Sequence, residues 1–189
     1  MGFDVGDEEL MLSYQAGDAA SFEILYQRHK GGLYRYILRQ CKSESITEEL
    51  FQDVWMNLIK ARERYEVKAK FSTWLYQMAH NRVIDHYRRQ KTSSGQNPAD
   101  AGLDADETPA RTQDQPEHQV AIQAKTEHLM MLVDALPEEQ KQAFLLREEA
   151  GMGLNEIAET CGINRETAKS RLRYAVNKLR EGLSAYEPG

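Results

Sequence analysis

The stretch KFSTWLYQMAHNRVIDHYRR, residues 70–89, combines the two features that decide the fold. Apolar residues recur in it at helical spacing: Trp74, Leu75, Met78 and Ala79. This spacing predicts a helix over residues 72–90 with one face in a core. The stretch also carries a second set of aromatic and basic residues: Phe71, Tyr76, Arg82, Tyr87, Arg88 and Arg89. It is therefore a core helix with a solvated basic edge or a surface for nucleic acid, and the rest of the chain bears on that choice.

The charge of the chain is unevenly distributed. Its 189 residues carry a net charge of −6, which argues against non-specific binding of nucleic acid by the whole chain. Residues 70–91 nevertheless hold five Lys or Arg and one acid, and residues 165–180 hold six Lys or Arg and one acid. Residues 92–118, between them, hold six acids and one base. Regional charge decides which surface can meet DNA, so two separate basic surfaces are predicted.

Several classes of protein are disfavoured by the sequence. No apolar run reaches the roughly 18–20 residues of a membrane span, and the acidic start MGFDVGDEEL does not resemble a signal peptide. The two cysteines, Cys41 and Cys161, are far apart and do not suggest a disulfide framework. We expect a cytoplasmic protein without direct insertion into a membrane.

No motif of catalysis is present in the sequence. There is no glycine-rich phosphate loop and no nucleophile elbow, and His80 and His86 are not spaced to share one helix face as metal ligands. We therefore expect no catalytic residue, no metal site and no cofactor. A metal-dependent hydrolase built on Glu48, Glu49 and Asp53 remains a minor alternative.

The chain is predicted to be all-α, with two small helical domains. In the first, residues 1–91, Asp18 can cap a helix that Gly31-Gly32 interrupts. Ser45 followed by Glu48 is a capping box, and Ser72 or Thr73 can cap the helix that follows.

The two domains are predicted to be joined by a flexible acidic linker, residues 92–119. This segment is rich in Ser, Gly, Pro, Asp and Gln, and Leu103 is its one large apolar residue, so it cannot bury enough surface to offset its ordering entropy. The helical pattern returns in the second domain, residues 120–189.

The second domain contains a helix-turn-helix pattern, LNEIAETCGINRETAKSRLRYAVNKLR. Ala158 and Gly162 allow the helices to cross closely, and Asn164 is an N-cap for the second helix. Polar and basic side chains then project from the start of that helix: Arg165, Glu166, Lys169, Ser170, Arg171 and Arg173. This is the part of a recognition helix that reaches the major groove, although an αα-hairpin with a solvated basic face fits the same pattern.

Three ordered motifs carry a family resemblance. The first is TEELFQDVW at residues 47–55. The second is Phe71, Trp74, Leu75, Met78, Ala79, Asn81, Asp85, Arg88 and Arg89. The third is EIA at residues 156–158 with Gly162, Asn164 and TAKSRL at residues 167–172. In all three the chain resembles the extracytoplasmic-function class of bacterial RNA polymerase sigma factors.

The resemblance implies a function and three sets of site residues. A sigma factor binds core RNA polymerase, directs it to promoters through −10 and −35 elements and promotes DNA opening. The set implied for the β′ coiled coil of the polymerase is Glu48, Glu49, Leu50, Gln52, Asp53 and Trp55. The set implied for single-stranded DNA at −10 is Tyr65, Lys68, Lys70, Phe71, Tyr76, Asn81, Arg82, Arg88 and Arg89. The set implied for double-stranded DNA at −35 is Arg165, Glu166, Lys169, Ser170, Arg171 and Arg173.

Further partners are implied by the same resemblance. They are the β flap of the polymerase and an anti-sigma factor, and the acidic linker would either run through the RNA path or act as a solvated tether. A stand-alone helix-turn-helix regulator is the alternative function, although it leaves the first two motifs unexplained.

Overall fold

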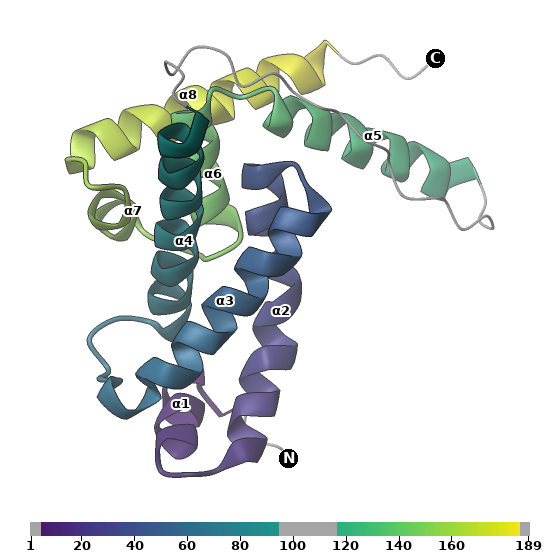
Figure 1. The fold of residues 1–189 in the computed structure, drawn as a ribbon. Coiled ribbons are helices and arrows are strands. Elements are labelled where there is room, and N and C mark those ends of the chain that lie inside the picture. The colour runs from purple at the N-terminus through teal and green to yellow at the C-terminus, as the bar shows by residue number, and fades with distance from the viewer. Residues whose placement is uncertain (1–4, 95–116, 186–189) are drawn as a thin grey trace. The chain divides into compact units, whose positions relative to one another are not determined.

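A computed structural model of the chain describes residues 5–94 and 117–185, and the regular elements in these two ranges are all helical. They form two compact units, with α1 to α4 in the first and α5 to α8 in the second (Figure 1). The prediction of an all-α chain is confirmed. Most of the predicted linker, residues 95–116, lies outside the described residues.

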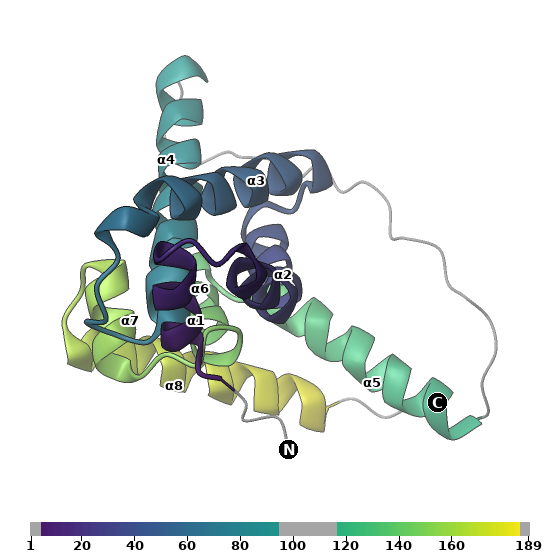
Figure 2. The same cartoon turned by 90° about the horizontal axis from the view of Figure 1, so that it is seen from below.

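The first unit is a bundle built around three long helices. Its elements are α1 (Asp7–Gln15), α2 (Ala19–Cys41), α3 (Glu44–Ala61), the 3-10 turn η1 (Arg62–Arg64) and α4 (Phe71–Ser94). α2, α3 and α4 pack against one another, and α1 packs against both α2 and α4 (Figure 2). Fully buried residues such as Leu25, Leu50 and Leu75 bring one apolar face of each long helix into a common core.

The helix ends in this unit differ in part from the prediction. The Asp18 side chain accepts the N–H of Ala20 at 3.1 Å, which confirms it as the cap of α2. The predicted interruption at Gly31-Gly32 is wrong, because α2 continues to Cys41. Each glycine costs a helix about 1 kcal/mol relative to alanine, and the buried residues that follow, such as Leu33 and Tyr36, offset this cost.

The cap predicted for α3 at Ser45 is also wrong, by two residues. Lys42 adopts a left-handed conformation with φ 54° and ends α2, so the chain turns at once. Ser43 is then extended, and its hydroxyl accepts the N–H of Ile46 at the start of α3. The cap is a serine, as predicted, but it lies closer to the preceding helix.

One buried histidine makes the stability of this unit depend on pH. His80 is 6% exposed, and its Nδ1 lies 3.3 Å from the hydroxyl of Tyr36. Burial lowers the pKa of the His80 imidazole below its usual value of 6.5. Below that value the unfolded chain therefore binds a proton that the folded chain does not, so the contribution to stability is present above pH 6.5 and is lost as the pH falls.

We expect the thermal unfolding midpoint of the first unit to decrease when the pH is lowered from about 7.5 to about 5.5. The decrease should be smaller in a His80→Gln variant. The chain has two tryptophans, Trp55 and Trp74, and both lie in this unit. Tryptophan fluorescence therefore follows its unfolding selectively. Equal pH dependence in the two proteins would show that another group is responsible.

The second unit contains α5 (Glu117–Asp134), α6 (Glu138–Glu148), α7 (Leu154–Cys161) and α8 (Arg165–Ser184). α8 packs against the other three helices. It lies close to α5 at Gly182, where an added Cβ would be 2.5 Å from a Leu132 methyl carbon. The long α8 is thus the central element of this unit.

No helix among the residues described here has the length and apolar character needed to cross a membrane.

Candidate functional sites

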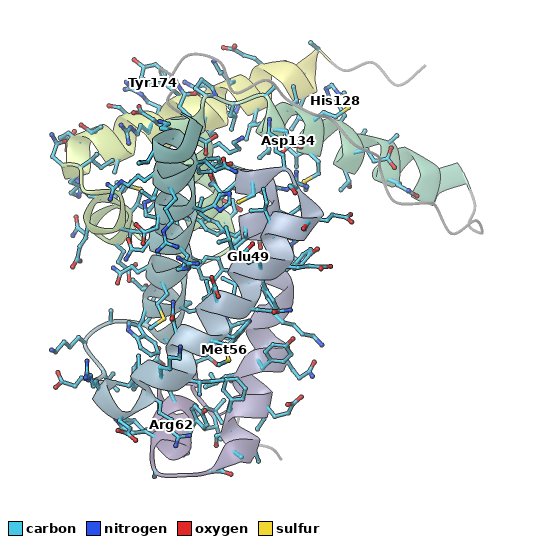
Figure 3. The ribbon with its side chains drawn as sticks, in the orientation of Figure 1. Glu49, Met56, Arg62, His128, Asp134 and Tyr174 are labelled. Carbon is cyan, nitrogen blue, oxygen red and sulfur yellow. The ribbon has the colours of Figure 1, made fainter. Side chains whose placement is uncertain are left out.

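The outer face of α3 carries an exposed polar stripe that ends in a methionine. Glu48, Glu49 and Gln52 are exposed, as predicted from the TEELFQDVW motif. Met56, four residues after Gln52 and seven after Glu49, is 50% exposed and lies on the same side of the helix (Figure 3). An exposed apolar side chain next to acidic and amide groups suits a protein partner with a basic, partly apolar helix. The motif ends before Met56, so sequence reasoning missed this residue, although its heptad distance from Glu49 is a usable signal.

Two residues predicted on this face lie in the core instead. Leu50 is 1% exposed and Trp55 is 5% exposed. The Trp55 ring packs edge-on against Phe22 and Tyr26, with centroids 5.8 and 5.0 Å away. These two motif residues hold α3 against α2, so the prediction that they contact a partner is corrected.

Asp53 and Arg82 were predicted to serve different partners, but they form an ion pair with each other. The pair joins α3 to α4, and the Arg82 side chain is only 18% exposed. A charge that is paired and largely covered is a poor phosphate ligand. The structure thus gives Asp53 and Arg82 a contact between two helices that was not predicted, and their separate roles toward partners stay predictions.

The remaining basic and polar residues of the predicted −10 set are exposed. Lys68 and Lys70 lie in the loop before α4, and Asn81, Arg88 and Arg89 lie on α4. Lys68 forms an ion pair with Glu66 at 2.6 Å, and both side chains are mostly exposed. Because an exposed ion pair contributes only about 0–1 kcal/mol, a DNA phosphate can replace Glu66 at little cost.

The three aromatic residues of that set are buried. Phe71 is 0%, Tyr76 is 1% and Tyr65 is 5% exposed, so none offers a ring face to a DNA base. Tyr76 packs edge-on against Tyr36 with centroids 5.4 Å apart. Burial raises the pKa of Tyr65 to about 12, and its hydroxyl has no hydrogen-bond partner within the described part of the chain. The prediction that these rings line an open pocket is corrected, because they support the core under the loop.

Trp74, unlike these three rings, is partly exposed at the surface of α4. The sequence pattern assigned it to the core, but it is half-buried, and its ring lies 4.9 Å from the Tyr65 ring. Trp74, Asn81 and Arg88 are seven residues apart, about two helical turns, so they lie along one face of α4. This face offers an aromatic surface, an amide and a cation in one row.

The helix-turn-helix of the second unit is formed as predicted. Gly162 ends α7 in a left-handed conformation with φ 65°, which a side chain would strain. The Asn164 side chain accepts the N–H of Thr167 at 2.8 Å and caps α8. Ala158 and Ala168 are buried, and α7 packs against α8, as expected for small residues that allow a close crossing.

The start of α8 presents most of the predicted −35 set to solvent. Arg165, Glu166, Lys169 and Arg173 are exposed, and Ser170 is half-buried. The guanidinium carbon of Arg173 lies 5.2 Å from the ring centroid of the exposed Tyr174, which is labelled in Figure 3. An arginine stacked on a ring keeps its hydrogen-bond donors free at the edge of the guanidinium plane.

Arg171 is the exception in this set. It pairs with Glu139 of α6 at 2.8 Å, and its side chain is 20% exposed. The pair fixes α8 against α6. Arg171 therefore helps to orient the helix, and its contact with DNA stays a prediction.

The described residues contain no group of three or more His, Cys, Asp or Glu side chains that could hold a metal ion. The hydrolase alternative placed Glu48, Glu49 and Asp53 with nearby histidines. In the structure Asp53 is paired with Arg82, and His80 is buried beside Tyr36.

The two units match two family descriptions. Residues 25–93 match Sigma-70 region 2, and residues 126–179 match Sigma-70, region 4. The chain is 26% identical over 177 residues to the RNA polymerase sigma factor CarQ of Myxococcus xanthus, covering 94% of this chain and 97% of the relative. It is 27% identical over 173 residues to the ECF RNA polymerase sigma factor SigM of Mycobacterium tuberculosis, covering 92% and 82%.

Solved structures share the fold. One is the sigma factor RpoE in complex with the anti-sigma factor NepR from Bartonella quintana, with a TM-score of 0.67, 19% identity and coverage of 88% of this chain and 98% of that one. Another is CnrH in complex with the cytosolic domain of CnrY, with a TM-score of 0.64, 19% identity and coverage of 96% and 99%.

Proposed function

The chain belongs to the extracytoplasmic-function class of RNA polymerase sigma factors, and we propose that three of its surfaces have separate roles in promoter recognition. The face of α3 with Glu48, Glu49, Gln52 and Met56 binds the β′ coiled coil of core polymerase. The loop before α4 and the outer face of α4 bind the opened −10 element. The start of α8 reads the −35 element as duplex DNA.

One observation carries this division. Each of the two matched regions lies almost entirely within one structural unit, and each unit presents its own exposed basic face. Opening DNA costs about 1.4 kcal/mol per step on average, and stacking a base on an aromatic ring returns roughly 1–3 kcal/mol. Trp74 at the surface of α4 is the side chain that supports such capture in this structure.

A transcription assay tests the proposal. Purified core polymerase is supplied with this protein and a library of promoter fragments, and the starts of the transcripts are mapped. We expect promoter-dependent transcripts whose upstream sequences align into two elements. Binding to duplex DNA alone, without any promoter-dependent transcript, would support the stand-alone regulator instead.

Asn81→Ala should impair opening at the −10 element while leaving the thermal midpoint unchanged, because Asn81 is exposed and its amide can bond a base edge. One lost hydrogen bond of about 1 kcal/mol corresponds to a roughly fivefold slower opening rate. Permanganate reactivity of unpaired thymines follows this opening on a duplex promoter. Gln90→Ala, another exposed amide near the end of α4, is the matched control. If Asn81→Ala opens the promoter as fast as the control, Asn81 is outside the interface.

The proposal extends to an inhibitory partner. The RpoE structure similar to this chain is a complex with an anti-sigma factor. We place such a partner among the expected ligands of this chain, in competition with core polymerase.

A further inference from the structure

Helix α1 contacts both ends of the loop that joins η1 to α4. This short helix comprises nine residues, Asp7–Gln15, and belongs to none of the three motifs that carry the family resemblance. It packs against α2, η1 and α4. The loop that it borders, residues 65–70, precedes the helix proposed to bind the −10 element.

The first end of the loop is held by Gln15. Its side-chain nitrogen donates to the backbone carbonyls of Arg62, Glu63 and Tyr65, at 3.0, 3.1 and 3.1 Å. The residue before it contributes as well, because the Arg62 guanidinium lies 5.2 Å from the Tyr14 ring centroid (Arg62 is labelled in Figure 3). The two N–H groups of a single amide are thus shared among three carbonyls of one tight turn.

The second end of the loop is held by Glu8. Its carboxylate accepts the backbone N–H of Phe71, the first residue of α4, at 2.7 Å. A carboxylate at this position also interacts favourably with the positive end of the helix dipole. The prediction that Ser72 or Thr73 caps α4 is wrong, because α4 already begins at Phe71 and both residues lie inside it. The acceptor for the first N–H comes instead from a distant helix.

Between these two anchors the loop is exposed to solvent. Residues 66–70 are all exposed, and Val67 is 53% exposed. The rings at the two ends, Tyr65 and Phe71, are buried. Because ordering each backbone residue costs roughly 1–2 kcal/mol, the shape of such a loop depends on how firmly its ends are fixed.

We infer that α1 positions the loop that reads the −10 element, with Gln15 and Glu8 as positioning residues. They act through the loop, which presents Val67, Lys68 and Lys70 to the opened strand, and neither touches DNA. The inference rests on the proposed function, because it assigns a role within −10 recognition. Each residue has the hydrogen-bonding group that its end of the loop requires. Gln15 supplies donors to backbone carbonyls, and Glu8 supplies an acceptor to a backbone N–H.

The test compares two variants with matched controls in holoenzyme reconstituted with purified core. Gln15→Ala removes the three carbonyl contacts. Its control is Gln27→Ala on α2, where the exposed Gln27 amide binds Glu23 of the same helix. Glu8→Gln weakens the cap of α4, and its control is Glu9→Gln, an exposed neighbour on the same turn of α1. The probes are a single-stranded −10 oligonucleotide from a promoter mapped in the transcription assay and the same oligonucleotide with single-base changes.

We expect Gln15→Ala to bind the −10 oligonucleotide about tenfold more weakly, the factor for the loss of one to two net hydrogen bonds. The ratio of its affinities for the matched oligonucleotide and for those with single-base changes, the preference ratio, should decrease. Glu8→Gln should show the same effects to a smaller extent, because the amide oxygen still accepts. Affinity for core and use of the −35 element should be unchanged in both variants.

The preference ratio separates positioning from a general loss of stability. A partly unfolded variant lowers the active fraction and weakens binding to every probe equally, so the ratio stays constant; tryptophan fluorescence reports that fraction directly. The inference is overturned if the unsubstituted chain supports promoter-dependent transcription but both variants have the same preference ratio as their controls. Absence of promoter-dependent transcription by the unsubstituted chain would overturn the proposed function, and this inference with it.

Discussion

Replacing Met56 with Asp should abolish most binding to core polymerase while leaving the fold intact. Met56 is 50% exposed in the row with Glu49 and Gln52, so it makes few contacts within the chain. In an interface it becomes the apolar end of an otherwise polar row, and a carboxylate there would be buried without a partner. Hot-spot residues of this kind contribute 2 kcal/mol or more, so we expect affinity to fall by at least roughly 30-fold.

Met131→Asp provides the matched control for this result. Met131 is also an exposed methionine, at 69%, but it lies on α5 of the second unit. Fluorescence anisotropy with labelled protein and core polymerase measures both affinities, and thermal unfolding followed by far-UV circular dichroism verifies that both variants are folded. A similar loss for the two variants would place Met56 outside the polymerase interface.

Loss of Lys169 and Arg173 together should remove most use of the −35 element without affecting binding to core. Both side chains are exposed near the start of α8, one helical turn apart, and Arg173 is stacked on Tyr174. A well-placed contact between Arg or Lys and a base is worth about 1–3 kcal/mol. The double alanine variant should therefore lose on the order of 30-fold or more in transcription from promoters that depend on this element.

The position of the charge, and not its amount, is what this experiment must isolate. Lys178→Ala with Arg180→Ala removes the same charge from the later part of α8 and serves as the control. Transcription from a promoter with an intact −10 element and a scrambled −35 element should be equal for the unsubstituted chain and the two double variants. Equal losses for the two double variants on the intact promoter would point to a general electrostatic effect.

Local signals in the sequence predicted local structure well. Asn164 caps a helix whose bonded N–H is three residues away, and Gly162 supplies the conformation that ends the preceding helix. Asp18 likewise caps α2 through an N–H two residues away. The helix-turn-helix and the exposed start of α8 follow from such signals, because all the interacting groups lie within one short segment.

Contacts between distant segments were not predictable in the same way. The spacing of Tyr65, Phe71 and Tyr76 does not tell whether their rings face solvent or another helix, and in the structure all three are buried. Asp53 and Arg82 are 29 residues apart, and each has an obvious partner outside the chain until the fold brings them together. Burial and pairing of this kind depend on how whole helices pack, which a pattern along one helix does not contain.

The contacts made by α1 have a consequence for the order in which the chain matures. Glu8 and Phe71 are 63 residues apart, and Gln15 is 47 to 50 residues from the carbonyls that it binds. A helix of nine residues is too short to be stable alone. During synthesis α1 leaves the ribosome before α4 but can be held only after the start of α4 has emerged. A nascent chain thus gains the ordered loop only when its first unit is almost complete, so competence for promoter opening arises late in folding.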